Sequence, residues 1–138
     1  MIDKKLEENI KKTRDFMDIW NKFHDIFRST VSADHVDAEK EKEFLSIKSL
    51  VSSRYEDLMD SLGVKPLRRF IINASAYNIF SIDKLSIMSD VKLAVFDRDW
   101  LESSNFLKTL YDRLGRKKRR IENFNKFAFV IKKGIKGR

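Results

Sequence analysis

Apolar side chains recur three or four positions apart in the first part of the chain, which is the period of an amphipathic α-helix. One row of this pattern is Leu6, Ile10, Thr13, Met17, Trp20, His24, Phe27 and Val31. A second row beside it is Phe16, Ile19, Phe23 and Ile26. Together they predict a first helix of about seven turns with a wide apolar face. The pattern breaks between Thr30 and Asp34.

A second helix is predicted after this break. Asp34 or Asp37 is suited to cap its first turn, because a short acidic side chain accepts from free backbone N–H groups there. Its apolar row is Phe44, Val51, Tyr55, Leu58 and Leu62, interrupted by Lys48. Gly63 follows where a left-handed residue often ends a helix. Two long helices with a short polar link are expected to fold back as an antiparallel hairpin.

Pro66 is suited to the first turn of a third helix, where a backbone N–H has no partner in any case. One face of this helix is predicted to hold Leu67, Phe70, Ile71, Ala74 and Tyr77, while Ile72, Ile79 and Phe80 make other sides apolar. We therefore expect the third helix to be the most buried element. The segment 81–88 has no clear period and is compatible with a single turn.

Ser89 is suited to cap a fourth helix. Its apolar row is Leu93, Phe96, Trp100, Ser103, Leu107, Leu110 and Leu114, and the spacing continues through Ile121, Phe124, Ala128 and Ile131. This row is expected to pack on the first two helices.

The charged run from Arg116 to Arg120 decides how this helix continues. Five consecutive charges point in every direction around a helix axis, so this turn is not expected to lie against an apolar core. Either the helix projects beyond the other helices or Gly115 ends it. We favour the projecting helix, because one glycine costs only about 1 kcal/mol. Glu122 can also pair with Lys118 or Lys126 at four-residue spacing.

The predicted fold is all-α: an antiparallel bundle of three to four helices with a long C-terminal helix projecting as a basic arm. We place the bundle at residues 1–114 and the arm at residues 115–138. One proline and four glycines in 138 residues argue against a β-rich or loop-rich architecture. The absence of cysteine excludes disulfides and thiolate sites. The charged N-terminus lacks a secretory signal pattern and no apolar run could span a bilayer, so a cytoplasmic location is expected.

Positive charge is confined to the C-terminal end of the chain. Residues 113–138 contain eleven Lys or Arg and one acid, whereas residues 1–112 contain 18 Lys or Arg and 20 Asp or Glu. The segment therefore carries a balance of +10 and the rest a balance of −2. An anionic partner is expected to bind this end.

Two sets of residues in this segment are candidate binding residues. The anion-binding or nucleic-acid-binding candidates are Arg113, Arg116, Lys117, Lys118, Arg119, Arg120, Lys126, Lys132 and Lys133. The partner-docking candidates are Ile121, Phe124, Phe127, Phe129 and Ile131. Dense cationic groups release counterions from phosphate polymers, and interleaved aromatic rings can stack on unpaired bases. The same composition suits an anionic membrane surface or an acidic protein groove, and a plain solubilising tail is the simplest alternative.

The sequence contains none of the usual catalytic, metal or nucleotide-binding patterns. No glycine-rich loop is present, and neither His24 nor His35 has a carboxylate at helical ligand spacing before it. His24 lies on an apolar row, so we interpret it as a core or boundary histidine. The acidic pairs Asp15 with Asp18, Glu39 with Glu43, Asp57 with Asp60 and Asp97 with Asp99 are interpreted as a solvated face. We predict no enzyme activity, no metal, no cofactor and no small-molecule substrate.

The leading functional prediction is a helical adaptor or scaffold that binds a protein partner, including a second copy of itself, and docks an anionic surface through the basic arm. Self-association would use the long apolar rows in the manner of a coiled coil, with polar interruptions at Thr13, His24 and Lys48 setting the register. The alternatives are a nucleic-acid-binding protein, with phosphate contacts along the arm, and a peripheral protein of anionic membranes.

Overall fold

The computed structural model describes residues 3–31, 36–85 and 88–136, with side chains described as far as Val130. These residues form five α-helices and no β-strand. The helices are α1 (Lys4–Val31), α2 (Ala38–Ser61), α3 (Pro66–Ile72), α4 (Ala74–Phe80) and α5 (Asp90–Lys136). The all-α class is therefore confirmed. The expected number of three to four helices is wrong, because the predicted third helix is divided into α3 and α4.

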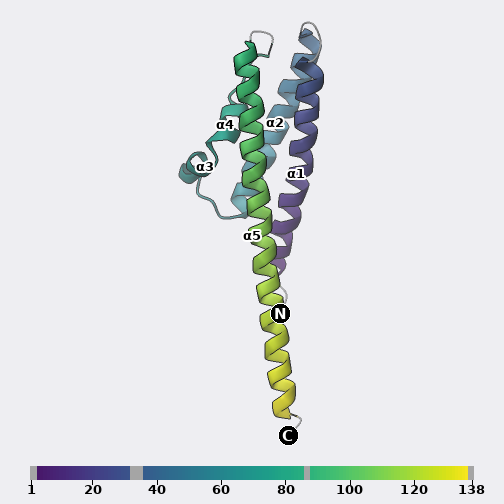
Figure 1. Ribbon diagram of the computed structural model, residues 1–138, viewed down its shortest axis with the longest axis vertical. Helices are drawn as coiled ribbons and strands as arrows, with labels where there is room; N and C mark the ends of the chain where they lie inside the picture. Colours follow the sequence, from purple (N-terminus) through teal and green to yellow (C-terminus); the bar gives the residue numbers. More distant parts are fainter. Residues whose placement is uncertain (1–2, 32–35, 86–87, 137–138) are drawn as a thin grey trace.

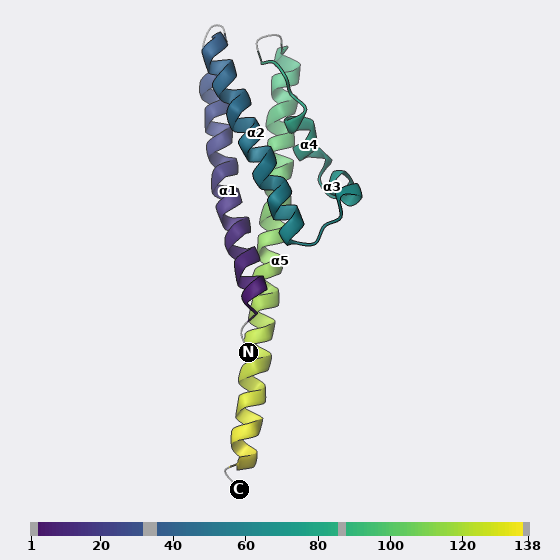
Figure 2. The ribbon, with the colours of Figure 1, turned by 180° about the vertical axis from the view of Figure 1, so that it is seen from behind.

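The helices α1, α2 and the first half of α5 lie side by side (Figures 1 and 2). α1 and α2 run in opposite directions, and α5 packs along α1. α4 packs on α5, whereas α3 stands out from the side of the molecule (Figure 2). The C-terminal part of α5 continues past the beginning of α1, where no other described helix lies beside it (Figure 1).

Aromatic side chains fill the space between α1, α2 and α5. Phe27 of α1 stacks on Phe96 of α5 with ring centroids 3.7 Å apart. Phe23 stacks on Phe44 of α2 at 5.3 Å. All four side chains are at most 1% exposed. Aromatic pairs of this kind stabilise a core by about 0.5–1.5 kcal/mol each beyond their area burial, so this cluster joins the three long helices.

Trp20 and Trp100 connect α1 to α5 through a reciprocal pair of hydrogen bonds. Nε1 of Trp20 donates to the backbone carbonyl of Trp100 at 3.3 Å, and Nε1 of Trp100 donates to the carbonyl of Trp20 at 3.1 Å. A helical carbonyl keeps a second lone pair after its own helix bond, so both indoles are satisfied without breaking either helix. The pair fixes the register of α1 against α5.

Short polar residues begin α2 and α5 as the sequence predicts. Oδ1 of Asp37 accepts from the N–H of Glu39 at 2.9 Å. The hydroxyl of Ser89 accepts from the N–H of Lys92 at 3.3 Å. Of the two cap candidates for α2, the structure uses Asp37, and Asp34 lies outside the described residues.

Gly63 ends α2 as predicted. It has a φ of +72°, the left-handed conformation that glycine adopts without strain. Its N–H donates to the carbonyl of Asp60, and the N–H of Val64 donates to the carbonyl of Met59, both at 3.0 Å. This is the Schellman arrangement of a helix C-terminus.

The predicted third helix is interrupted at Asn73, and the expectation that it would be the most buried element is wrong. Asn73 has φ −153° and ψ 68°, and its side chain caps α4 by accepting from the N–H of Ala76. The same side chain donates to Tyr55 and Ser103, at 3.2 and 3.1 Å. These contacts fix the chain between the two short helices, so α4 is packed inward and α3 is turned outward.

The choice left open at Gly115 is settled in favour of a continuous helix. α5 runs for 47 residues from Asp90 to Lys136 without a break at this glycine. The described part of the C-terminal segment is therefore a regular extension of the helix that packs on α1.

Candidate functional site

The candidate site is the part of α5 that follows Asp112. It passes the first turn of α1 near Lys118 and continues beyond the beginning of that helix (Figure 1). Leu6 and Glu7 of α1 share a surface cavity with Lys118, Ile121 and neighbouring residues of α5. Leu6 is 5% exposed. The first turn of α1 therefore packs against α5 at this level of the helix.

Four arginines gather on one side of this segment. Arg113, Arg116, Arg119 and Arg120 line a shallow depression together with Asn123. All four arginines are exposed, and none forms an ion pair with a carboxylate within the described part of the chain. We call these four residues the arginine cluster. Free guanidinium groups at this density can bind phosphate or carboxylate groups in bidentate fashion.

Lys118 is a predicted anion-binding residue, but it does not belong to the arginine cluster. Its Nζ lies 3.7 Å from Oε1 of Glu7 and 3.9 Å from Oε1 of Glu122. The side chain is 41% exposed and faces the start of α1. The predicted pairing with Glu122 is confirmed. This charged turn was not expected to lie against an apolar core, and the contact of Lys118 with α1 agrees with that, because it is a partly exposed ion pair with Glu7.

The apolar candidates also divide into one residue that lies beside α1 and others that are exposed to solvent. Ile121 is half-buried at the cavity beside Leu6. Phe124, Phe127 and Phe129 are exposed by 68, 63 and 66%, and so is Val130 by 66%. The side chains of Ile131, Lys132 and Lys133 lie outside the described residues. We call the exposed residues Phe124, Phe127, Phe129 and Val130 together the terminal apolar surface; by helix geometry Phe129 lies on the opposite side of α5 from Phe127.

His24 is a boundary histidine, as its position on the apolar row of α1 predicts. Its ring stacks on Trp100 with centroids 3.9 Å apart, and Nε2 lies 2.8 Å from Oδ1 of Asp97. It is 7% exposed. No group of three His, Cys, Asp or Glu side chains that could hold a metal ion is found among the described residues. His35 lies outside them.

One of the acidic residues predicted to lie on a solvated face, Asp99, is placed differently by the structure. Asp99 is only 5% exposed, and burial raises the pKa of its carboxyl. Asp97 contacts His24, and its side chain is 50% exposed. Asp60 forms an ion pair with Arg69, and its side chain is still 69% exposed. The interpretation as a solvated face is therefore wrong for Asp99, whereas the exposed Asp60 agrees with it.

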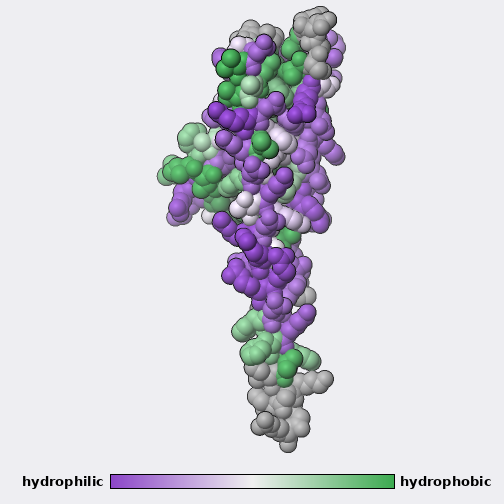
Figure 3. Space-filling view, viewed as in Figure 1, coloured by the Kyte–Doolittle hydropathy of each residue, from purple (hydrophilic) through white to green (hydrophobic). Residues whose placement is uncertain are grey.

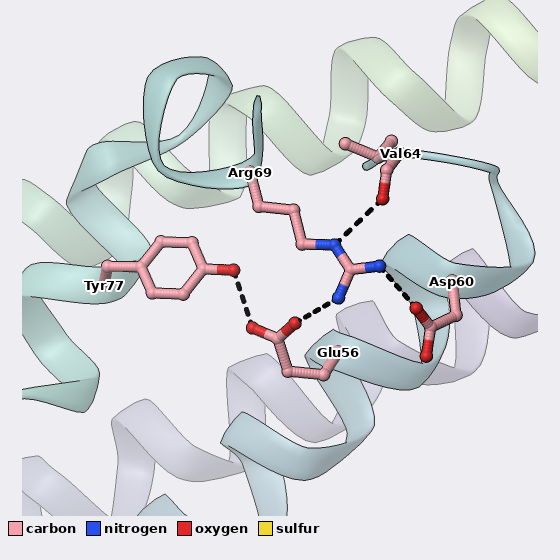
Figure 4. A network of polar contacts seen from close by, with 5 residues as sticks. All are labelled: Glu56, Asp60, Val64, Arg69 and Tyr77. Carbon is pink, nitrogen blue, oxygen red and sulfur yellow. Dashed lines mark hydrogen bonds and ion pairs between the residues drawn. The ribbon is translucent and has the colours of Figure 1, made fainter. Parts of the chain in front are cut away.

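Sequence reasoning missed a network around Arg69 in α3 (Figure 4). The guanidinium donates through Nε to the carbonyl of Val64 at 3.0 Å and through its terminal nitrogens to Glu56 and Asp60. Glu56 also accepts from the hydroxyl of Tyr77 at 2.6 Å. Arg69 is 6% exposed. The signal available in the sequence is the four-residue spacing of the two carboxylates, which puts them on one face of α2.

Two tyrosines beside this network are kept neutral. Burial raises the pKa of Tyr55 to about 12. Burial also raises the pKa of Tyr77, and its hydrogen bond to Glu56 acts in the same direction. Both phenols therefore keep their protons at neutral pH, and Tyr77 remains a donor to the carboxylate of Glu56. The network is structural, since it holds α3 and α4 against α2.

Comparisons with models of protein families, with curated proteins and with solved structures found no match to this chain.

Proposed function

We propose that this chain is a non-enzymatic adaptor or scaffold that docks an anionic surface through the C-terminal part of α5. In this proposal α1, α2 and the first half of α5 form an antiparallel bundle that presents surface to a protein partner. The part of α5 after Leu114 is a projecting basic arm. The division at this point and a cytoplasmic location remain predictions.

The observation that carries the proposal is the arginine cluster on an uninterrupted helix. Arg113, Arg116, Arg119 and Arg120 converge on one depression without a carboxylate partner among the described residues. Four like charges at this spacing repel one another, so the arrangement is costly to the isolated chain. An anionic partner removes that repulsion and releases its own counterions.

Binding to a soluble polyanion tests the electrostatic part of the proposal. The full chain is titrated with a fluorescent single-stranded DNA of about 20 nucleotides at roughly 50 and 200 mM salt. The parent is expected to bind at low salt and to lose affinity at least about tenfold at the higher salt, as four neutralised phosphates require. Replacing the four arginines with Gln is expected to flatten this dependence.

A matched control separates the arginine cluster from net charge. Lys11, Arg14, Lys22 and Arg28 are exposed cations of α1, so changing them to Gln removes the same total charge. This control is expected to retain most of the affinity. Equal losses in both quadruple variants would show that binding follows net charge alone, and no binding by the parent at low salt would refute the proposal.

A nucleic-acid-binding function is the second candidate, and one observation favours it. Asn123 lies in the same depression as the arginines, and the exposed ring of Phe124 follows it. An amide can contact a base edge while a neighbouring ring stacks on an unpaired base. In this case Asn123→Ala and Phe124→Ala should lower affinity for mixed-sequence single strands more than for an abasic phosphate polymer. Equal losses on both polymers would remove this candidate.

A further inference from the structure

α3 displays its apolar side chains to solvent. Leu67 and Ile71 are 91 and 79% exposed, and Phe70 is 57% exposed. The helix stands out from the rest of the molecule, and Figure 3 shows an apolar patch over it. We call Leu67, Phe70 and Ile71 the α3 surface. Exposed apolar groups gathered on a projecting element commonly mark a contact site.

Polar residues in and next to α3 fix the orientation of this helix. Arg69 points inward to Glu56, Asp60 and the carbonyl of Val64 (Figure 4). At about 100° per residue, Leu67 and Ile71 lie roughly opposite Arg69 on the helix. Asn73, the residue that follows α3, is fixed by hydrogen bonds from its side chain to Tyr55 and Ser103. The outward orientation of the apolar side chains is therefore part of the folded arrangement.

The α3 surface is convex and small. Three such side chains, even with Ile72 beside them, present on the order of 400 Å² of apolar area, whereas a stable protein interface needs about 800 Å² on each partner. A second copy docking on α3 alone would therefore be weak. A lipid headgroup layer accepts a convex apolar element without a matching cavity.

The charge around α3 is positive. No Asp or Glu occurs between Asp60 and Asp83 in the sequence, and Lys65 and Arg68 are exposed beside the α3 surface. Two carboxylates of α2 that contact α3, Glu56 and Asp60, are paired with Arg69. Apolar side chains with cations beside them fit an anionic bilayer surface, where the apolar groups enter and the cations contact headgroups.

Three residues of the arginine cluster, Arg113, Arg116 and Arg120, and part of the terminal apolar surface lie on the same side of the molecule as α3. Glu102 of α5 marks that side, because it accepts from Ser75 at the start of α4 at 2.7 Å. By helix geometry, Arg113, Arg120, Phe124 and Phe127 fall within roughly 40° of Glu102 around the axis. Figure 3 shows the result on one face: an apolar patch over α3, a strongly hydrophilic stretch over α5, and a second apolar patch toward its end.

We propose that this face docks on an anionic lipid bilayer, with the α3 surface and Phe124 and Phe127 entering the headgroup region and the arginine cluster contacting anionic lipid between them. The proposal rests on the anionic docking proposed above and names the surface concerned. The contact is peripheral, and no helix in the described part of the chain is long and apolar enough to cross a membrane.

Vesicle co-sedimentation tests the proposal with the full chain. The parent is expected to bind phosphatidylcholine vesicles that contain roughly 30% phosphatidylserine, and to bind pure phosphatidylcholine at least about tenfold more weakly. Leu67→Ser with Ile71→Ser is expected to lower binding to the anionic vesicles about tenfold or more. The matched control is Leu50→Ser with Leu101→Ser, which are also exposed apolar positions, at 51 and 53%. This control should bind as the parent does.

A site-specific probe gives a direct readout. The chain has no cysteine, so Leu67→Cys can be labelled alone with an environment-sensitive fluorophore. Its emission is expected to shift to the blue and increase with anionic vesicles, while the same label at Leu50→Cys stays unchanged. Unchanged circular dichroism and melting temperature of each variant would show that its fold is intact.

The outcomes separate this proposal from the preceding one. Binding to DNA without binding to vesicles would overturn the bilayer proposal and leave anionic docking in place. If the parent binds neither DNA nor anionic vesicles, both the anionic docking and the bilayer proposal are overturned. Vesicle binding that depends on the arginines but not on Leu67 and Ile71 would remove α3 from the contact. A dimer that dissociates in the Leu67→Ser, Ile71→Ser variant would identify a second copy as the occupant of the α3 surface and refute the bilayer.

Discussion

The two short helices α3 and α4 adjoin at Asn73 and have seven residues each, yet they bury opposite kinds of side chain. α4 buries Ala76 and Ile79, and its polar positions face outward or are hydrogen-bonded. α3 buries Arg69 alone and leaves Leu67 and Ile71 in solvent. Apolar content therefore does not decide which of the two packs inward.

The difference follows from the partners available to each helix. α4 lies on α5, where it shares a core with aromatic side chains such as Trp20 and Tyr55. α3 meets α2 where that helix offers Glu56 and Asp60. A guanidinium can satisfy two carboxylates and a carbonyl at once, whereas leucine or isoleucine at that position would satisfy none of them. The paired carboxylates thus select Arg69 for the inward position, and the apolar side chains opposite it turn outward.

Truncating one isoleucine in α3 and one in α4 should give the largest difference in the free energy of unfolding. Ile79→Ala removes a fully buried side chain and is expected to lower the free energy of unfolding by about 2–5 kcal/mol. Ile71→Ala makes the same chemical change at a position that is 79% exposed. It is expected to change the free energy of unfolding by less than about 0.5 kcal/mol. Urea unfolding followed by circular dichroism measures both. Similar losses in the two variants would contradict the packing contrast.

Asn73→Ala is expected to cost about 1–3 kcal/mol, because it removes the cap of α4 and leaves buried groups of Tyr55 and Ser103 without this donor. Tyr55→Phe is the sharper comparison, since it deletes one acceptor and leaves the cap in place. It is expected to cost about 1 kcal/mol. An Asn73 variant as stable as the parent would show that the separation of α3 from α4 does not depend on this side chain.

Arg69→Gln should release α3 without unfolding the long helices. A glutamine cannot reach both carboxylates and the carbonyl of Val64, so the hydrogen bonds that hold α3 would be lost. Amide hydrogen exchange is expected to speed up at residues 66–72 and to stay slow in the cores of α1 and α5. Arg68→Gln is the matched control, because Arg68 is the exposed neighbour. Faster exchange throughout the chain would mean that Arg69 supports the whole fold.

The long helices and the short helices α3 and α4 differ in how far the sequence predicts them. The long helices were predictable, because their apolar rows extend over many turns and their ends carry Asp37, Gly63 and Ser89, which were recognised as caps. The break at Asn73 was not, since its backbone conformation depends on Tyr55 and Ser103, which are distant in the sequence. Helical periodicity also cannot distinguish a helix that packs on a core from one that faces water.

The candidate site was predictable to a similar extent. Composition alone locates the positive charge after Asp112, and spacing alone places most of the arginine cluster on one face. It does not reveal that Lys118 turns toward Glu7, because that pair joins residues from opposite ends of the chain. Helical periodicity also places the α3 surface in the core, because it does not show that Glu56 and Asp60 of α2 draw Arg69 inward.

The smallest expected effect concerns Asp99, which faces α4 from α5. Burial raises the pKa of its carboxyl above the ordinary value of 3.8, so the folded chain holds this proton more tightly than the unfolded chain. The stability that the neutral carboxyl contributes is therefore fully present below that ordinary value and is lost as pH rises through the folded pKa. Asp99→Asn keeps a polar group of the same size but does not titrate.

The Asn variant is accordingly expected to resist urea better than the parent at about pH 7, with the difference shrinking toward about pH 4. Comparing the variant with the parent at each pH isolates Asp99 from the other carboxylates, which titrate in both proteins. Asp18→Asn, at an exposed position of α1, is the control and should show no such trend. A difference of equal size at both pH values would mean that packing, and not the charge on Asp99, opposes the contact between α5 and α4.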